Sequence, residues 1–170
     1  MKVAIALGSS LGERQRVLER ALAHLDHTPG IRVLRVSRWV RTPPLPGGAA
    51  RNWFLNGVAL LESSLRPEVL LARCVALEEQ AGRRRNLHWG DRTLDIDVLV
   101  AEGEMVRTDR LELPHPAIAS RPFVLGPLLE VWPDVRNPRT GASYAALPAP
   151  PGPRPAPCGV VARRRLLRYL

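Results

Sequence analysis

Residues 89–100 read WGDRTLDIDVLV, and the interpretation of the whole chain starts from this stretch. Asp95 and Asp97 lie two positions apart in a run that otherwise has the apolar character of a buried strand. Because strand side chains alternate between faces, the two aspartates share one face and the apolar residues share the other. Their Cα atoms are expected about 7 Å apart. The stretch therefore predicts a strand with one apolar face and a carboxylate pair on the other.

A carboxylate pair in a strand calls for an explanation, because aspartate is disfavoured there and like charges repel. At this spacing the two groups can share one metal ion or bracket two, an arrangement used in phosphate chemistry. The alternative is a solvated face of an edge strand, which a short D-x-D motif also allows. The preceding loop is rich in cations that could bind a polyphosphate, namely Arg83, Arg84, Arg85 and Arg92. The combination favours a magnesium–nucleotide site.

Strand-like and helix-like segments alternate on both sides of this stretch. Apolar runs predict strands over residues 3–8, 31–40, 54–64 and 93–100. Helical spacing predicts helices over 14–25 and 67–80, with Gly82 at the end of the second, and a short helix within 111–133. The segments 41–52 and 82–92 are expected to be loops. Short spacings between these elements predict an α+β sandwich, with helices on one face of the sheet.

The net charge of +9 invites a nucleic-acid interpretation, but the charge is unevenly distributed. Residues 1–134 contain one Lys and 17 Arg against 16 acidic residues, a net charge of +2. Residues 135–170 contain seven Arg and no acidic residue, a net charge of +7. The body of the chain is therefore nearly neutral, and we expect no nucleic-acid partner.

Other features of the composition agree with one ordinary globular domain. At 170 residues the chain is long enough for a single core, and no apolar run approaches the ~20 residues of a membrane span. Cys74 and Cys158 suggest neither a disulfide framework nor a metal site. We expect a cytoplasmic monomer with no membrane partner. The Pro- and Arg-rich segment 136–170 is expected to be a partly ordered extension, with a basic arm for an acidic partner as the less favoured alternative.

Six sequence blocks point to a known family. They are GSSLG (8–12), RTPPL (41–45), FLNGV (54–58), RTLDIDVL (92–99), LPHP (113–116) and RPFVLGPL (121–128). In this order they resemble the 6-hydroxymethyl-7,8-dihydropterin pyrophosphokinase family of folate biosynthesis. The resemblance implies a ferredoxin-like α/β sandwich whose mostly antiparallel sheet has helices packed on its faces. It covers about residues 1–135, expected to be the catalytic domain, with 136–170 as an extension.

The resemblance also implies a reaction and the residues that carry it. Pyrophosphate would pass from MgATP to the hydroxymethyl group of the pterin, with release of AMP. Asp95 and Asp97 would coordinate two Mg²⁺ ions, and with Arg83 and Arg92 they form the expected catalytic set. Expected ATP contacts are Glu78, Arg83, Arg85, Trp89, Arg92, Arg110, His115 and Arg121. Expected pterin contacts are Thr42, Pro43, Leu45, Phe54, Asn56 and Phe123.

Several of these positions have simpler interpretations. Phe54 and Phe123 could pack in the core, the commoner fate of phenylalanine, although we favour stacking on the pterin. His115 could be a loop histidine without a partner. The chain also departs from the family pattern, with Ser10 in place of a common Asn and Asp91 where Pro is frequent.

Two other functions remain open at this stage. A nucleotide-sugar transferase could use Asp95 and Asp97 as its D-x-D motif, although such enzymes need a longer chain. A ferredoxin-like RNA-binding module would need exposed aromatic residues on adjacent strands, and only 5% of the chain is aromatic.

Overall fold

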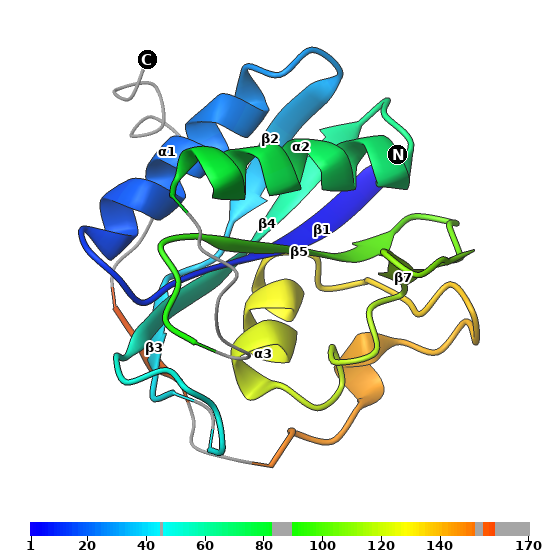
Figure 1. Ribbon diagram of the computed structural model, residues 1–170. Coiled ribbons are helices and arrows are strands. Elements are labelled where there is room, and N and C mark those ends of the chain that lie inside the picture. Colours follow the sequence, from blue (N-terminus) through cyan, green and yellow to red (C-terminus); the bar gives the residue numbers. More distant parts are fainter. Residues whose placement is uncertain (45, 83–89, 152–154, 159–170) are drawn as a thin grey trace.

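The computed structural model describes residues 1–44, 46–82, 90–151 and 155–158. Its secondary structure begins β1 (Lys2–Ser9), α1 (Arg14–Asp26), β2 (Ile31–Val36), β3 (Val40–Thr42), β4 (Phe54–Ser63) and α2 (Pro67–Gln80). It continues with β5 (Asp95–Ala101), β6 (Val106–Arg107), β7 (Glu112–Leu113), α3 (Pro122–Val131), the 3-10 helix η1 (Tyr144–Ala146) and β8 (Ala156–Pro157). Figure 1 shows the fold, coloured along the sequence from blue at the N-terminus to red at the C-terminus.

The described strands form one main sheet and a small hairpin. The main sheet has the order β5-β1-β4-β3-β8, and β2 pairs with β4 beyond the short β3. Each of these pairings is antiparallel, and β6 with β7 forms the hairpin. The expected mostly antiparallel α+β sandwich of the ferredoxin-like kind is confirmed.

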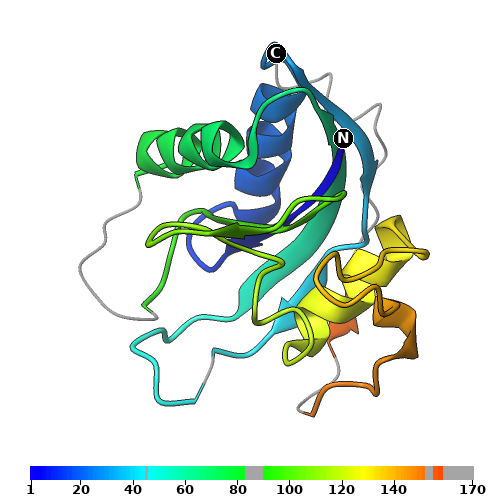
Figure 2. The same cartoon turned by 90° about the vertical axis from the view of Figure 1, so that its right-hand side faces the viewer.

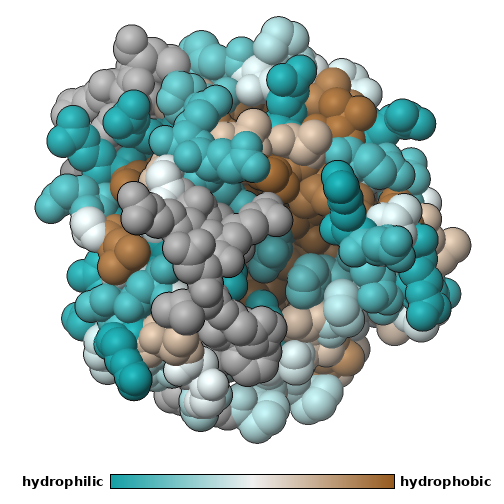
Figure 3. All heavy atoms as spheres, viewed as in Figure 1, coloured by the Kyte–Doolittle hydropathy of each residue, from teal (hydrophilic) through white to brown (hydrophobic). Residues whose placement is uncertain are grey.

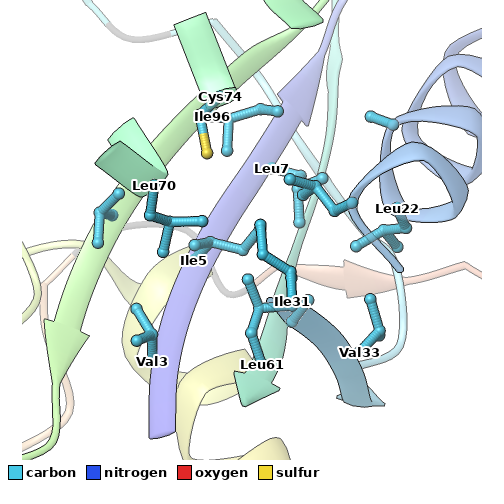
Figure 4. Close-up of a cluster of buried hydrophobic side chains, with 14 of the residues drawn as sticks. Val3, Ile5, Leu7, Leu22, Ile31, Val33, Leu61, Leu70, Cys74 and Ile96 are labelled. Atoms are coloured by element: carbon cyan, nitrogen blue, oxygen red, sulfur yellow. The ribbon is translucent and has the colours of Figure 1, made fainter. Parts of the chain in front are cut away.

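The first face of the sheet packs against α1 and α2. Ile5 of β1 and Ile96 of β5 point into this layer, where they meet Leu22 of α1 and Leu70 of α2 (Figure 4). Each of these side chains is buried, so the layer is a continuous apolar core. The helical spacing in the sequence is thus explained, because one stripe of each helix is buried against the sheet.

The opposite face is covered by α3, as Figure 2 shows from the side. Leu125 and Leu128 of α3 pack against Val58 of β4 and Leu99 of β5. The expectation that helices cover one face only is therefore wrong, whereas the family resemblance, which placed them on its faces, is right. The face of the sheet on which a helix packs depends on contacts between segments that are distant in sequence, and local periodicity does not predict such contacts.

The expected strand over residues 31–40 is interrupted in the structure. Between β2 and β3 lie residues 37–39, which belong to neither strand, and the Ser37 hydroxyl accepts a hydrogen bond from the Val58 backbone N–H at 2.9 Å. Trp39 is fully buried beside Gly57, where a Cβ atom would lie 2.5 Å from the indole ring. The indole thus occupies the space of a missing side chain, and only glycine fits at this point of β4.

The ends of α2 agree with the sequence. Pro67 begins the helix, and Gly82 follows it with a φ of 77°, a left-handed conformation that glycine adopts without strain.

Part of the segment after α3 returns to the sheet. Tyr144 of η1 is buried against the α3 layer, and β8 pairs with β3. The Cys158 backbone N–H donates to the Trp39 carbonyl at 2.7 Å. Residues 155–158 thus lie along the edge of β3, on the segment that leads into the candidate site.

Among the described helices, none combines the length and apolar character that a membrane crossing requires.

Candidate active site

A cavity of about 260 Å³ opens at one end of the sheet, beside the start of α3. Strands β3, β4 and β5 and the loops that flank them contribute its walls. The lining residues are Thr42, Pro43, Ala50, Phe54, Asn56, Gly90, Arg92, Asp95, Asp97, His115, Arg121 and Phe123. Most of the residues predicted from the sequence to bind substrates are therefore brought together.

The carboxylate pair lies in this cavity. Burial alternates along β5, because Ile96 and Val98 enter the core beneath α1 and α2 while Asp95 and Asp97 line the cavity. The predicted sharing of one face is confirmed. β5 is an edge strand, as the simpler interpretation supposed, but the two carboxylates face a lined cavity on the α3 side.

Charged neighbours surround the pair. Arg92 Nη1 lies 2.6 Å from Asp95 Oδ2, an ion pair that is partly shielded from solvent. Burial raises the pKa of Asp97, and the negative charge of Asp95 raises it further, while His115, Arg121 and Arg92 oppose the shift. The fold therefore holds Asp97 in a place where its charge is unfavourable unless a cation is near.

His115 lines the same cavity as the two aspartates and is held by a hydrogen bond to β5. Its backbone N–H donates to the Leu99 carbonyl of β5 at 2.7 Å. Its Nδ1 accepts a hydrogen bond from the Ala117 backbone at 3.1 Å, which assigns the proton of the neutral ring to Nε2. Burial lowers the pKa of His115, Asp97 opposes this and Arg121 adds to it. The interpretation of His115 as a loop histidine without a partner is wrong.

The cavity is also lined by a polar pair and by two aromatic rings. Asn56 of β4 donates from Nδ2 to Thr42 Oγ1 at 2.7 Å, and both residues are buried. A Cβ atom on Gly8, its partner on β1, would lie 2.7 Å from Asn56 Oδ1, so the amide needs glycine opposite. Phe54 and Phe123 line the cavity and are partly exposed. Phe123 also packs against the apolar core on the α3 side of the sheet, and stacking of either ring on the pterin stays a prediction.

Two predicted ATP contacts lie elsewhere. Glu78 of α2 is buried behind β5, where its Oε1 accepts a hydrogen bond from the Ile96 backbone at 2.7 Å. Arg110 is exposed and lines a groove of about 540 Å³ between α2 and residues 108–111. Figure 3 shows apolar side chains in a hollow below α2. Neither residue lines the main cavity, and their predicted roles stay predictions.

Four predicted contacts lie outside the described residues: Leu45, Arg83, Arg85 and Trp89. Their roles likewise stay predictions.

Sequence reasoning missed two residues that organise the cavity wall. Ser10 is buried, donates its N–H to the Arg92 carbonyl at 2.9 Å and accepts the Arg92 N–H on its hydroxyl at 2.9 Å. Asp91 accepts hydrogen bonds from the loop at residues 51–52. The only sequence signal for either was its departure from the family pattern.

The donor set of the cavity fits Mg²⁺ that arrives with a nucleotide. Asp95 and Asp97 supply hard oxygen ligands, and within the described residues no group of three His, Cys, Asp or Glu could hold a metal ion. Magnesium commonly uses one or two carboxylates and completes its shell with water and substrate phosphates. The arrangement is thus suited to a metal–polyphosphate complex rather than to a metal held by protein ligands alone.

Comparison with known proteins agrees with the site. The model of the 7,8-dihydro-6-hydroxymethylpterin-pyrophosphokinase family matches residues 4–133. A 2-amino-4-hydroxy-6-hydroxymethyldihydropteridine pyrophosphokinase of Methylorubrum extorquens is 44% identical over 131 residues, 77% of this chain and 82% of the relative. Proteins of the same name from Pseudomonas aeruginosa and Bacillus subtilis are 40% and 38% identical, over 81% of this chain and 84% and 82% of theirs. The chain belongs to the 7,8-dihydro-6-hydroxymethylpterin-pyrophosphokinase family.

Proposed function

We propose that this protein transfers the pyrophosphoryl group of ATP to the hydroxymethyl oxygen of 6-hydroxymethyl-7,8-dihydropterin and releases AMP, a step of folate biosynthesis. One observation carries the assignment of the site. A single cavity combines the Asp95–Asp97 pair with the Asn56–Thr42 pair and two aromatic rings. The first set suits a metal-bound polyphosphate, and the second suits a flat heterocycle with a polar edge.

Asp95 and Asp97 are the residues that would hold Mg²⁺, and we propose two ions, as in the family. When bound, Mg²⁺ neutralises phosphate charge and supports in-line displacement at phosphorus. Asp95 is paired with Arg92 at 2.6 Å, so Asp95 would hold the ion and the Arg92 guanidinium would then be available to phosphate oxygens. Asp97, whose pKa is raised by burial and by Asp95, gains most from a nearby cation.

The phosphate side of the cavity also contains His115 and Arg121. With its proton on Nε2, the neutral His115 ring can donate a hydrogen bond to a phosphate oxygen. Arg121 supplies a fixed positive charge at the start of α3. These groups act by positioning and by electrostatic stabilisation, which dominate catalysis of phosphoryl transfer.

The pterin side orients the nucleophile. Phe54 and Phe123 would stack on the two faces of the pterin, and Asn56 would bond its amide edge. Because Asn56 Nδ2 already donates to Thr42, the side-chain orientation is set before the substrate binds. Preorganisation of this kind lowers the entropic cost of bringing the hydroxymethyl group in line with the β-phosphorus.

We also propose that the enzyme acts as a monomer in the cytoplasm. The partners are then the two small-molecule substrates, ATP and the pterin.

The test is the identity of the nucleotide product. Incubation with ATP, Mg²⁺ and 6-hydroxymethyl-7,8-dihydropterin should yield AMP and the pterin pyrophosphate in equal amounts, as measured by chromatography. Formation of ADP, or nucleotide turnover that does not depend on the pterin, would contradict the proposal. Hydrolysis of a UDP- or GDP-sugar instead would favour the D-x-D transferase.

Asp97→Ala tests the metal assignment. Loss of a ligand to the metal–phosphate complex should lower kcat/KM by about 10³-fold or more, since one well-placed electrostatic contact contributes a factor of this order. Asp134→Ala removes an exposed carboxylate from the turn after α3 and serves as the matched control. Retention of activity in Asp97→Ala, with a normal circular dichroism spectrum, would remove Asp97 from the catalytic set.

A further inference from the structure

One carboxylate joins two loops of the cavity wall that are far apart in sequence. Asp91 Oδ2 accepts hydrogen bonds from the Arg51 backbone at 3.1 Å and from Asn52 Nδ2 at 2.9 Å. Its Oδ1 accepts a third bond, from the Asn52 backbone at 3.2 Å. Three donors on two consecutive residues thus converge on one side chain, an arrangement that fixes a turn much as a carboxylate fixes the start of a helix.

The two loops joined by Asp91 carry different halves of the cavity. Ala50, just before the bonded turn, lines the cavity, and its loop runs between Pro43 and Phe54, two of the proposed pterin contacts. Gly90 and Arg92, the two neighbours of Asp91, also line it, and Arg92 is paired with Asp95, one of the proposed metal ligands. The Asp91 bonds therefore hold the two walls against each other at the rim of the cavity.

The backbone around Asp91 is itself held in place. Ser10 bonds both the N–H and the carbonyl of Arg92, each at 2.9 Å. Although burial alone would raise the pKa of Asp91, hydrogen bonds from Arg51, Ser10 and Asn52 lower it, so the carboxylate is ionised at neutral pH. Asp91 is thus a charged acceptor on a fixed segment.

The partner turn has a second support on its other side. Arg14 Nη1 donates to the Trp53 carbonyl at 2.8 Å, and the Arg41 guanidinium lies 5.2 Å from the centre of the Trp53 ring. Arg51, Asn52 and Trp53 are exposed, although Ala50 before them is buried, so these polar contacts set the position of the turn at residues 51–53. Removal of Asp91 would then leave the turn attached at one side only.

We propose that Asp91 is a positioning residue for the transfer reaction, which sets the arrangement of the pterin wall relative to the phosphate wall by holding the 51–52 turn against residues 90–92. This inference rests on the proposed function for the names of the two walls. The alternative is that the Asp91 bonds are a surface contact that does not influence the cavity. In that case removal of the Asp91 side chain would leave substrate binding unchanged, and the measurements below distinguish the two cases.

The first measurement needs no turnover. Trypsin cleaves after Arg51, an exposed residue of the bonded turn, and cleavage requires the turn to open. Asp91→Ala removes all three hydrogen bonds, so the rate of cleavage at Arg51–Asn52, followed by mass spectrometry, should rise at least about tenfold, the effect of losing even one hydrogen bond to a charged group. Asp134→Asn, which removes the same charge from an exposed turn, should cleave like the wild type.

The second measurement compares the two substrates. In Asp91→Ala the KM for the pterin should rise about tenfold. The KM for ATP should change less than about twofold, because Ser10 still holds the backbone of Arg92. Asn52→Ala should raise the pterin KM in the same direction, and the double variant should show less than the product of the two effects, as coupled residues do.

Either of two results would overturn the inference. One is an unchanged cleavage rate at Arg51–Asn52, and the other is an equal rise of both KM values, which indicates a general structural defect. If Asp91→Ala fails to fold, Asp91→Asn has the same shape with a single acceptor oxygen and should show a smaller rise in cleavage. Because the cleavage rate is read without substrates, failure of this inference is distinguishable from failure of the proposed function.

Discussion

The two faces of the main sheet are built from the same strands but meet different surroundings. Toward α1 and α2 the sheet presents an apolar layer that includes Ile96 of β5. Toward α3 the middle of the sheet is apolar, with Leu99 in contact with the helix layer, but its end carries Asp95 and Asp97. One strand therefore supplies both the core and the charged part of the candidate site.

The comparison shows how a small domain can keep two close carboxylates. Burial of an ionised group without a partner is unfavourable, and the raised pKa of Asp97, caused first by burial and then by Asp95, reflects this. The apolar side chains on the other face of β5 hold the strand in register whatever the aspartates bind. Side chains of the core and side chains of the candidate site thus alternate along a single strand.

We expect the largest loss of stability from a substitution in the apolar layer beneath α1 and α2. Leu22 of α1 is fully buried in that layer, so Leu22→Ala should lower the free energy of unfolding by about 2–5 kcal/mol, as cavity-forming substitutions do. Urea denaturation measures this loss. Val69→Ala, at an exposed position of α2, is the control and should change stability by about 0.5 kcal/mol or less. A loss below about 1 kcal/mol for Leu22→Ala would show that the layer is less tightly packed than described.

On the polar face, removal of the Asp97 charge should have a smaller effect on stability, of opposite sign. Asp97→Asn removes an unfavourable charge and should raise the free energy of unfolding of the ligand-free protein by about 0.5–2 kcal/mol at neutral pH. The native pKa of Asp97 is raised, so the folded state binds the proton more readily than the unfolded state. The gain should therefore be complete above the native pKa and shrink as the pH falls through it.

Thermal denaturation between pH 4 and pH 8 measures this dependence. Asp134→Asn is the control, because it removes an exposed carboxylate for which no comparable burial exists. A loss of stability in Asp97→Asn at neutral pH would contradict the inference that the charge is unfavourable in the empty cavity.

The last prediction concerns the chemical labelling of the two cysteines, Cys74 and Cys158, which reports on the packing around each thiol. Burial, with the charges of Glu78 and Asp97, raises the pKa of Cys74 to about 12, so the thiol is protonated and enclosed. Iodoacetamide should leave Cys74 unlabelled in the native protein and label it in urea. Cys158 is partly exposed beside β3 and should be labelled more readily. Equal labelling of both in the native state would contradict the described packing of α2 on β5.

Local pattern was enough to predict much of the fold. Alternation over residues 93–100 predicted the two faces of β5, and Pro67 with Gly82 predicted the limits of α2. The break between β2 and β3 could not be predicted in this way. It depends on the fit of Trp39 over Gly57, a match between segments that are neighbours only after folding.

The candidate site was predictable where residues carry a family motif. Asp97, His115 and Phe123 come from three separate blocks, and the fold brings them to one cavity. The Asp91 bonds were not predictable, because no periodicity relates residue 91 to residues 51–52. Roles that depend on the distance between two loops require the structure.

The pairing of β8 with β3 covers one edge of the main sheet. Successive N–H groups of a strand point to opposite sides, and the Cys158 N–H points inward, to the Trp39 carbonyl. The nitrogen of Pro157 therefore faces outward, where a proline offers no N–H to another chain. The last strand of the sheet thus closes an edge that could otherwise template growth by strand addition, and the chain carries its own protection against aggregation there.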